Sequence, residues 1–279
     1  MNLPQDFNFT QSNLQDYVDC PYRFYMKYIL RTKWPALVVD DALEFEERSQ
    51  TGARFHRLIQ QYLLGVPESR LAEMAEADPN PEVVNWWEDF LKVVPPLLEG
   101  DRSIEITLGA NAFGKHLLAK YDLILAKQDG SLSIFDWKTS RVRAKKNWLL
   151  DRIQTRLYRW MLLQTGAALT GRVTIQPNQV TMHYWFTASP EEPVTLPYNL
   201  DDCEKDHTYF KSLLEEIQAK AEGDFSHTED TRRCKYCVYR SHCDRGIEAG
   251  DLDSFEGFDE EAVESAFDID FDEIEEIEF

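Results

Sequence analysis

The chain has 279 residues, of which 43% are hydrophobic and 13% aromatic, enough for one sizeable core with at most a short appendage. No apolar run approaches the ~20 residues needed to cross a bilayer, and the N-terminus lacks the basic and apolar regions of a secretory signal. These features exclude a membrane-spanning protein and lead us to expect a cytoplasmic one. The formal net charge of −20 would argue against a nucleic-acid partner if it were spread evenly.

In chain order, the N-terminal part is predicted to be helical. Ser12 is a suitable N-cap for a helix that runs towards Leu30. Thr51 can cap a second helix, with apolar residues at helical spacing up to Tyr62. A further short helix is predicted between the prolines of 79–98.

The periodicity of the apolar residues changes after residue 100. Segments 104–108, 116–126 and 131–137 alternate or run apolar between glycine-containing turns, which predicts an antiparallel meander. The later patterns predict an amphipathic helix over 148–163, a strand over 179–187 and a helix over 206–221, with Asp201 as an alternative start. Together these elements predict one α/β domain over residues 1–245.

The charges divide this body from a C-terminal tail. Residues 246–279 contain 15 acidic residues and no lysine or arginine, which leaves 35 acidic against 30 basic residues in 1–245. Between Lys138 and Arg159, eight residues are basic and one is acidic. The body therefore carries a basic stripe suited to an anionic partner, and residues 246–279 are expected to form an acidic, disordered tail.

Two acids and a lysine are predicted to meet on neighbouring strands. Asp122 lies in one strand and Asp136-Trp137-Lys138 ends the next, so Asp136 and Lys138 share a face and strand pairing can bring Asp122 close to Asp136. Adjacent carboxylates repel each other unless a cation lies between them, and oxygen ligands favour Mg²⁺ or Mn²⁺. The ammonium of Lys138 could orient a water or stabilise charge on a phosphate. A surface salt bridge is the alternative interpretation.

Two further polar groups lie at helical spacing. Gln154 and Tyr158 are four residues apart on one helix face, among arginines that suit a phosphate backbone; taken alone, they would be expected to face solvent. His56 follows Gly52 by four residues on a predicted helix, and a lone helical histidine is more often structural than a ligand.

The five cysteines form a separate signal. An odd number in a chain expected to be cytoplasmic argues against a disulfide framework. Cys234-x2-Cys237-x5-Cys243 is compact enough to ligate a metal or cluster, with a fourth ligand from far away in the sequence. From spacing alone, both zinc and an iron–sulfur cluster remain open. Cys203 is interpreted as a buried free thiol.

Taken together, the motifs resemble a known family, the PD-(D/E)XK nucleases of the RecB type. The motifs are, in order, Gly52-x3-His56, Asp122, Asp136-Trp137-Lys138 and Gln154-x3-Tyr158. The opening Ser12–Leu30 segment, with Cys20, and the closing cysteines are similar to the iron–sulfur branch, which includes AddB-type nuclease domains and CRISPR spacer-acquisition exonucleases. The resemblance spans about residues 7–245 and departs at Tyr121, where the superfamily's name has proline.

The resemblance implies a restriction-endonuclease-like core, a small mixed sheet flanked by helices, with a helical N-terminal part and a C-terminal cysteine cluster. It implies that His56, Asp122 and Asp136 bind the metal and that Lys138 positions or activates the attacking water. Gln154 and Tyr158 would contact DNA near the scissile phosphate, and Glu105 is a candidate further acid. A 4Fe–4S cluster would bind Cys20, Cys234, Cys237 and Cys243 and staple the two ends of the body together.

We therefore expect an Mg²⁺- or Mn²⁺-dependent deoxyribonuclease that hydrolyses phosphodiester bonds. An exonuclease on single-stranded DNA or DNA ends is favoured, in DNA repair, recombination or CRISPR adaptation. The residues expected to bind the DNA backbone are Arg141, Arg143, Lys145, Lys146, Arg152 and Arg156. The alternatives are a non-catalytic iron–sulfur DNA-binding subunit of a repair complex and an iron–sulfur redox protein.

The acidic tail has three interpretations. It could be a solubilising disordered segment, or a mimic of a DNA strand that folds onto the basic stripe. It could also bind a protein partner through residues 250–279, whose acidic end with Ile277 and Phe279 is similar to the acidic tips of bacterial single-strand-binding proteins.

Overall fold

The computed structural model describes residues 3–4, 6–32, 39–171, 174–221 and 223–248. The predicted acidic tail, apart from residues 246–248, lies outside the described residues. No helix in the described part of the chain is long and apolar enough to cross a membrane.

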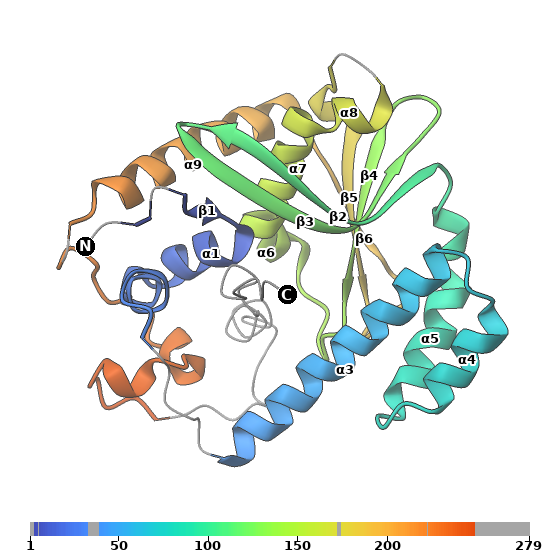
Figure 1. Cartoon of the computed structure of the whole chain (residues 1–279), viewed down its shortest axis with the longest axis horizontal. Helices are drawn as coiled ribbons and strands as arrows, with labels where there is room; N and C mark the ends of the chain where they lie inside the picture. The colour runs from blue at the N-terminus through green and yellow to red at the C-terminus, as the bar shows by residue number, and fades with distance from the viewer. Residues whose placement is uncertain (1–2, 5, 33–38, 172–173, 222, 249–279) are drawn as a thin grey trace, which may run out of the picture.

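A mixed sheet forms the centre of the molecule (Figure 1). Its strands are β1 (Asn8–Phe9), β2 (Asp101–Ala112), β3 (Lys115–Ala126), β4 (Leu132–Lys138), β5 (Val180–Phe186) and β6 (Val194–Pro197). The strand order is β1-β3-β4-β5-β6, and β2 pairs along β3. The β1–β3 and β4–β5 pairs are parallel, whereas the other pairs are antiparallel. The predicted meander is therefore confirmed as β2–β3–β4.

Helices cover both faces of this sheet. One face packs against α3 (Val39–Leu63), α4 (Glu68–Glu76) and α5 (Glu82–Val93). The other face packs against α1 (Gln11–Asp19), α2 (Pro21–Phe24), α6 (Lys146–Asp151), α7 (Ile153–Thr165) and α9 (Leu200–Ala219). Strand β4 shows why the sheet can serve both layers, because Ile134 packs into the α7 side while Phe135 and Trp137 pack into the α5 side.

Short elements complete the chain. A π-helical turn covers Tyr25–Ile29, α8 covers Ala167–Thr170, and 3₁₀ turns cover Pro95–Leu97, Pro177–Gln179, Arg233–Tyr236 and Arg240–His242. In Figure 1 the last two turns lie beside the N-terminal helices, although the two segments are far apart in the sequence. The architecture confirms the predicted α/β class and the restriction-endonuclease-like arrangement of a small mixed sheet between helices.

Several predicted helix boundaries were wrong. Thr10, not Ser12, caps α1, through a reciprocal pair of hydrogen bonds with Asn13. Thr51 does not cap a helix but lies inside α3, because no helix-breaking residue stands between Val39 and this position. Its hydroxyl donates to the Glu47 carbonyl (2.7 Å).

Other elements were divided, extended or missed. The predicted helix over 148–163 is divided at Arg152, whose extended backbone (φ −70°, ψ 143°) separates α6 from α7. Helix α9 begins at Leu200 with Asn199 as its cap, one residue before the alternative start. The sequence patterns did not predict α4, β1 or β6, which are short.

Candidate active site

The two acids meet where β3 and β4 separate. The strands pair from Leu123–Phe135 onwards, and the same register, continued by one residue, sets Asp122 opposite Asp136. At that point the Trp137 backbone N–H donates to Asp122 Oδ2 (2.9 Å). The side chain of Asp122 is therefore fixed where the strand pairing ends, and the two acids are neighbours across the strands, as the predicted pairing implied.

Lysine 138 lies beside the second acid. Its Nζ is 3.0 Å from Asp136 Oδ1, and both side chains are largely buried. Strand β5 runs parallel to β4 with Tyr184 opposite Asp136, and the Lys138 ammonium lies 5.9 Å from the centre of the Tyr184 ring. The predicted shared face of Asp136 and Lys138 is therefore observed, and it faces α7.

Helix α7 supplies the amide that orients Asp136. Gln154 Nε2 donates to Asp136 Oδ2 (2.8 Å), while the Tyr184 hydroxyl donates to Gln154 Oε1 (3.3 Å) and lies 2.7 Å from Thr155 Oγ1. Gln154 is only 5% exposed, which removes the interpretation that it faces solvent. Its amide is held at both ends and keeps the carboxylate in one orientation.

Tyrosine 158 lies one turn further along α7 and is buried. Burial raises the pKa of its hydroxyl well above the usual value, and the nearby charges of Asp136 and Asp122 raise it further. Its backbone carbonyl accepts a hydrogen bond from the Tyr121 hydroxyl (2.9 Å). The side chain is thus neutral and close to both acids.

Histidine 56 approaches the first acid from the opposite side of the sheet. It lies on α3, and its Nδ1 is 3.7 Å from Asp122 Oδ1. Burial opposes ionisation of Asp122, but the charge of a protonated His56, the hydrogen bond from the Trp137 N–H and the charge of Lys138 together hold the pKa of Asp122 below its usual value. Asp122 is therefore ionised and able to bind a cation.

Glycine 52 explains the spacing of the Gly-x3-His motif. A Cβ built at Gly52 would lie 2.8 Å from Thr139 Oγ1, just beyond the end of β4. The missing side chain lets α3 approach the strand that carries Asp136, and His56 follows one helical turn later. The glycine thus sets the distance between α3 and the acids.

The structure adds Glu105 to this group. Among the described residues, His56, Glu105 and Asp122 each bring one ligand atom within 4.8 Å of the others. The predicted metal set was His56, Asp122 and Asp136. Asp136 lies outside the group that the structure gathers, because its two oxygens face Lys138 and Gln154.

The backbone at Glu105 has an unusual conformation. Its φ of 50° lies in the left-handed region, which costs a non-glycine residue about 1–3 kcal/mol. The β2–β3 register sets it opposite Asp122. At this pair the side chains of both strands change the core that they face. Ile106 and Tyr121 pack on the α7 side, whereas Ile104 and Leu123 pack on the α5 side. The twist turns both acids out of the two cores.

The predicted DNA-binding residues fall into two groups. The four at 141–146, between β4 and the first turn of α6, are exposed: Arg141, Arg143, Lys145 and Lys146. The other two do not support the prediction. Arg152 is 4% exposed, with its guanidinium 4.7 Å from the centre of the Trp148 ring. Arg156 pairs with Asp206 (2.5 Å) and stacks on Tyr209, so α7 is packed inside the protein.

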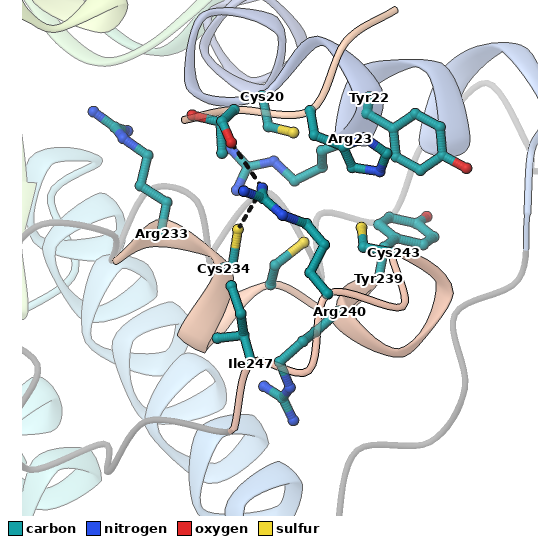
Figure 2. A pocket seen from close by; sticks show the side chains of 13 residues that line it. Cys20, Tyr22, Arg23, Arg233, Cys234, Tyr239, Arg240, Cys243 and Ile247 are labelled. Atoms are coloured by element: carbon teal, nitrogen blue, oxygen red, sulfur yellow. Dashed lines mark hydrogen bonds between the residues drawn. The ribbon is translucent and has the colours of Figure 1, made fainter. Parts of the chain in front are cut away.

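Four cysteines line one pocket (Figure 2). Cys20 joins α1 to α2. Cys234 lies in the first C-terminal 3₁₀ turn, and Cys237 and Cys243 directly follow the first and second of these turns. Burial raises the pKa of Cys243 to about 11, and the other three thiols contribute in the same direction, which reflects their proximity. Cys203, on α9, is not among the described residues that line this pocket.

One solved structure shares this architecture. No curated protein matches the chain. A protein from Eubacterium rectale that is provisionally named an exonuclease shares the fold, with 10% identity, a TM-score of 0.53 and coverage of 91% of this chain and 94% of that one. A structure named SSO0001 has 14% identity, a TM-score of 0.37 and coverage of 86% and 87%.

A family model assigns the chain. The model of the PD-(D/E)XK nuclease superfamily matches residues 8–244, which includes the acids, the lysine, the α7 motif and all of the pocket cysteines. The chain belongs to the PD-(D/E)XK nuclease superfamily.

Proposed function

We propose that the chain is a divalent-metal-dependent deoxyribonuclease that hydrolyses phosphodiester bonds, acting as an exonuclease on single-stranded DNA or DNA ends. The observation that carries the proposal is the meeting of Asp122, Asp136 and Lys138 with His56 and Gln154, which come from separate elements. A structural salt bridge would need one carboxylate and one cation. Two carboxylates, a histidine and an oriented amide around one lysine are better explained by chemistry on a phosphate.

The metal would be held by His56, Glu105 and Asp122. The resemblance adds Asp136, whose oxygens face Lys138 and Gln154 in this structure. The superfamily uses divalent metals, and one imidazole with carboxylates suits Mn²⁺ or Mg²⁺. When bound, such an ion polarises the phosphate and lowers the pKa of a coordinated water.

The protein's own groups would orient the reactants. Gln154 fixes the carboxylate of Asp136, and Asp136 in turn holds the ammonium of Lys138 at 3.0 Å. From there Lys138 can align a water or stabilise the charge that develops on the phosphate. The resemblance implies that Tyr158 contacts DNA near the scissile phosphate, but its neutral side chain is buried beside the acids, so it would support the site from behind.

The exposed basic segment would bind the DNA backbone next to this site. Arg141, Arg143, Lys145 and Lys146 follow directly after Lys138, and such contacts position DNA without reading its sequence. The proposed preference for ends and single strands rests on the resemblance and on the provisional name of the Eubacterium rectale protein. On the same resemblance we propose a cytoplasmic role in DNA repair, recombination or CRISPR adaptation. The similarity of the acidic tail to the tips of single-strand-binding proteins leads us to propose residues 250–279 as a segment for a protein partner.

The decisive experiment compares wild-type protein with Asp136→Asn on end-labelled linear and circular DNA. We expect wild type to degrade linear single strands with Mg²⁺ or Mn²⁺ and to stop with chelator. Asp136→Asn should lose cleavage by about a thousandfold or more and retain DNA binding, whereas Asp101→Asn, an exposed carboxylate at the start of β2, should behave as wild type. If both wild type and Asp136→Asn bind DNA without cutting it, the chain is a binding subunit instead.

We also propose that Cys20, Cys234, Cys237 and Cys243 hold a 4Fe–4S cluster. The four thiols share one pocket, which supports a common ligand. Four thiolates can hold either zinc or an iron–sulfur cluster, and it is the resemblance to the iron–sulfur branch that favours the cluster.

Anaerobic purification followed by visible absorption and metal analysis tests this proposal. We expect about four irons per chain and broad visible absorption, both lost in Cys243→Ser and kept in Cys203→Ser. One zinc per chain without colour would refute the cluster, while leaving the nuclease proposal untouched.

A further inference from the structure

A buried glutamine links the N-terminal helix α1 to the helix that carries Gln154. Gln15 is 6% exposed. Its Oε1 accepts a hydrogen bond from the Ile153 backbone N–H (3.1 Å), and its Nε2 donates to Asp19 Oδ1 (2.7 Å). Gln15 and Ile153 are far apart in the sequence, so this contact exists only in the folded protein.

The contact completes the start of α7. The first backbone N–H groups of a helix have no partner within the helix, and in the described structure Arg152, the N-cap residue, makes no side-chain cap. Gln15 supplies the missing acceptor from a different helix. Because Ile153 N–H can only donate, the amide oxygen of Gln15 must face it, and the amide nitrogen must therefore face Asp19.

The other end of the link reaches the cysteine pocket. Asp19 Oδ2 accepts from Arg23 Nη2 (3.0 Å), and Asp19 Oδ1 also pairs with Arg233 Nη1. Both arginines line the pocket (Figure 2), and Asp19 and Arg233 directly precede Cys20 and Cys234. Asp19 is 1% exposed, so its orientation is fixed by these partners.

The near end of the link reaches the acids. Ile153 is followed by Gln154, whose side chain donates to Asp136 Oδ2 (2.8 Å). Since both residues belong to the first turn of α7, a shift of that turn moves the amide that orients the carboxylate. The continuous path of buried polar contacts runs from the cysteine pocket through Asp19 and Gln15 to α7 and Asp136.

We propose that Gln15 is a positioning residue of the nuclease site: it fixes the first turn of α7, and so Gln154, against Asp136, and is itself fixed by the arginine-bound Asp19 of the cysteine pocket. The catalytic part of this inference rests on the proposed function. A general structural role for Gln15 would lower stability without changing the geometry at Asp136, so the two roles predict different results.

Four variants separate these roles. Gln15→Leu removes both hydrogen bonds. Gln15→Glu places two acceptors, the new carboxylate and that of Asp19, against each other. Asp19→Asn places its new amide nitrogen, a donor, against another donor. The double variant Gln15→Glu/Asp19→Asn exchanges acceptor and donor between the two side chains, so that the new carboxylate accepts from both Ile153 N–H and the new amide. It restores the contact to α7 but gives up the pair between residue 19 and Arg233. Tyr17→Phe is the matched control, because the Tyr17 hydroxyl joins α1 to Glu216 of α9 (2.6 Å) and lies outside the path.

The first measurement is amide hydrogen exchange of the peptide that starts α7, in protein without DNA. We expect Gln15→Leu to speed exchange at Ile153 and Gln154 by about tenfold, and the double variant to return it towards wild type. Tyr17→Phe should leave these amides unchanged. Unchanged exchange in Gln15→Leu overturns the proposal whether or not the wild-type protein cleaves DNA.

The second measurement is cleavage of end-labelled single-stranded DNA. We expect Gln15→Leu to lower kcat by about 10- to 100-fold while KM stays within about threefold, and the double variant to recover most of kcat. If Gln15→Leu does not fold, the single variant Gln15→Glu and the double variant carry the same comparison. Equal kcat in these variants and wild type, or equal losses in Tyr17→Phe, would overturn the proposal. A wild-type protein that cleaves nothing refutes the proposed function instead.

Discussion

Substituting Gly52 by alanine tests how closely α3 must approach β4. The new Cβ would lie 2.8 Å from Thr139 Oγ1, whereas the next atoms, Thr139 Cβ and Cγ2, are at 3.8 and 3.9 Å. The clash therefore comes from a single oxygen. Overpacking of this kind costs about 1–3 kcal/mol, while alanine in place of glycine inside a helix contributes about 1 kcal/mol of stability. We expect Gly52→Ala to be neutral to about 2 kcal/mol destabilising.

Removing the oxygen should reverse the sign. In Thr139→Ala the nearest remaining atom is the β-carbon at 3.8 Å, an ordinary contact. Gly52→Ala should then stabilise the protein by about 1 kcal/mol. The coupling between the two substitutions is thus expected to be about 1–3 kcal/mol.

Urea unfolding followed by tryptophan fluorescence measures this cycle for the four proteins. Cleavage at increasing Mn²⁺ adds a functional readout, because a shifted α3 moves His56 away from Asp122, now 3.7 Å distant. We expect Gly52→Ala to need more Mn²⁺ for half-maximal activity and the double variant to need the wild-type amount. A coupling below about 0.5 kcal/mol would refute the argument that Gly52 is needed for close approach.

Two further predictions concern Glu105 and Asp16. Glu105→Gln should raise the Mn²⁺ concentration for half-maximal cleavage by about tenfold or more. The control Lys120→Gln, which removes the ion-pair partner 3.1 Å from Glu105, should change this concentration little. Equal metal dependence of Glu105→Gln and wild type would exclude Glu105 as a ligand. Burial opposes ionisation of Asp16, but Arg23, Lys27 and a hydrogen bond from the Tyr28 hydroxyl outweigh it and hold the pKa of Asp16 below its usual value. The contribution of Asp16 to stability should be complete above about pH 4 and be lost as the pH falls through the lower pKa that Asp16 has in the folded protein. The urea midpoint of Asp16→Asn should therefore fall less steeply with acid than that of wild type, and parallel curves would contradict this.

Much of the candidate site could be predicted because its motifs are local. Alternation along β4 places Asp136 and Lys138 on one face whatever surrounds the strand. Two strands joined by a short turn have little freedom of register, so Asp122 and Asp136 were expected to be neighbours. Gly52 and His56 are one helical turn apart, which fixes their relative direction once α3 forms.

Other features depend on partners that are distant in sequence. The arginines of α7 follow the spacing of a DNA-facing helix, yet Arg156 is paired with Asp206 of α9. Their burial is decided by which helix packs on α7, and no local pattern contains that information. Glu105, a candidate acid from the resemblance, comes within ligand distance of His56 and Asp122 only in the folded chain. Its backbone there is left-handed (φ 50°), a conformation that single-sequence propensity disfavours for glutamate.

The amino-acid sequence by itself determined the class of the fold, the acids and lysine of the candidate site, and the compact group Cys234, Cys237 and Cys243, because these follow from periodicities and spacings of a few residues. The fourth candidate ligand, Cys20, was indicated only by the resemblance. The tertiary structure decided which carboxylates share ligand distance with His56, which arginines face solvent, and that Gln15 of α1 completes the start of α7. Those outcomes depend on contacts between segments separated by many residues, where each side chain's role is set by the neighbour that packing brings to it.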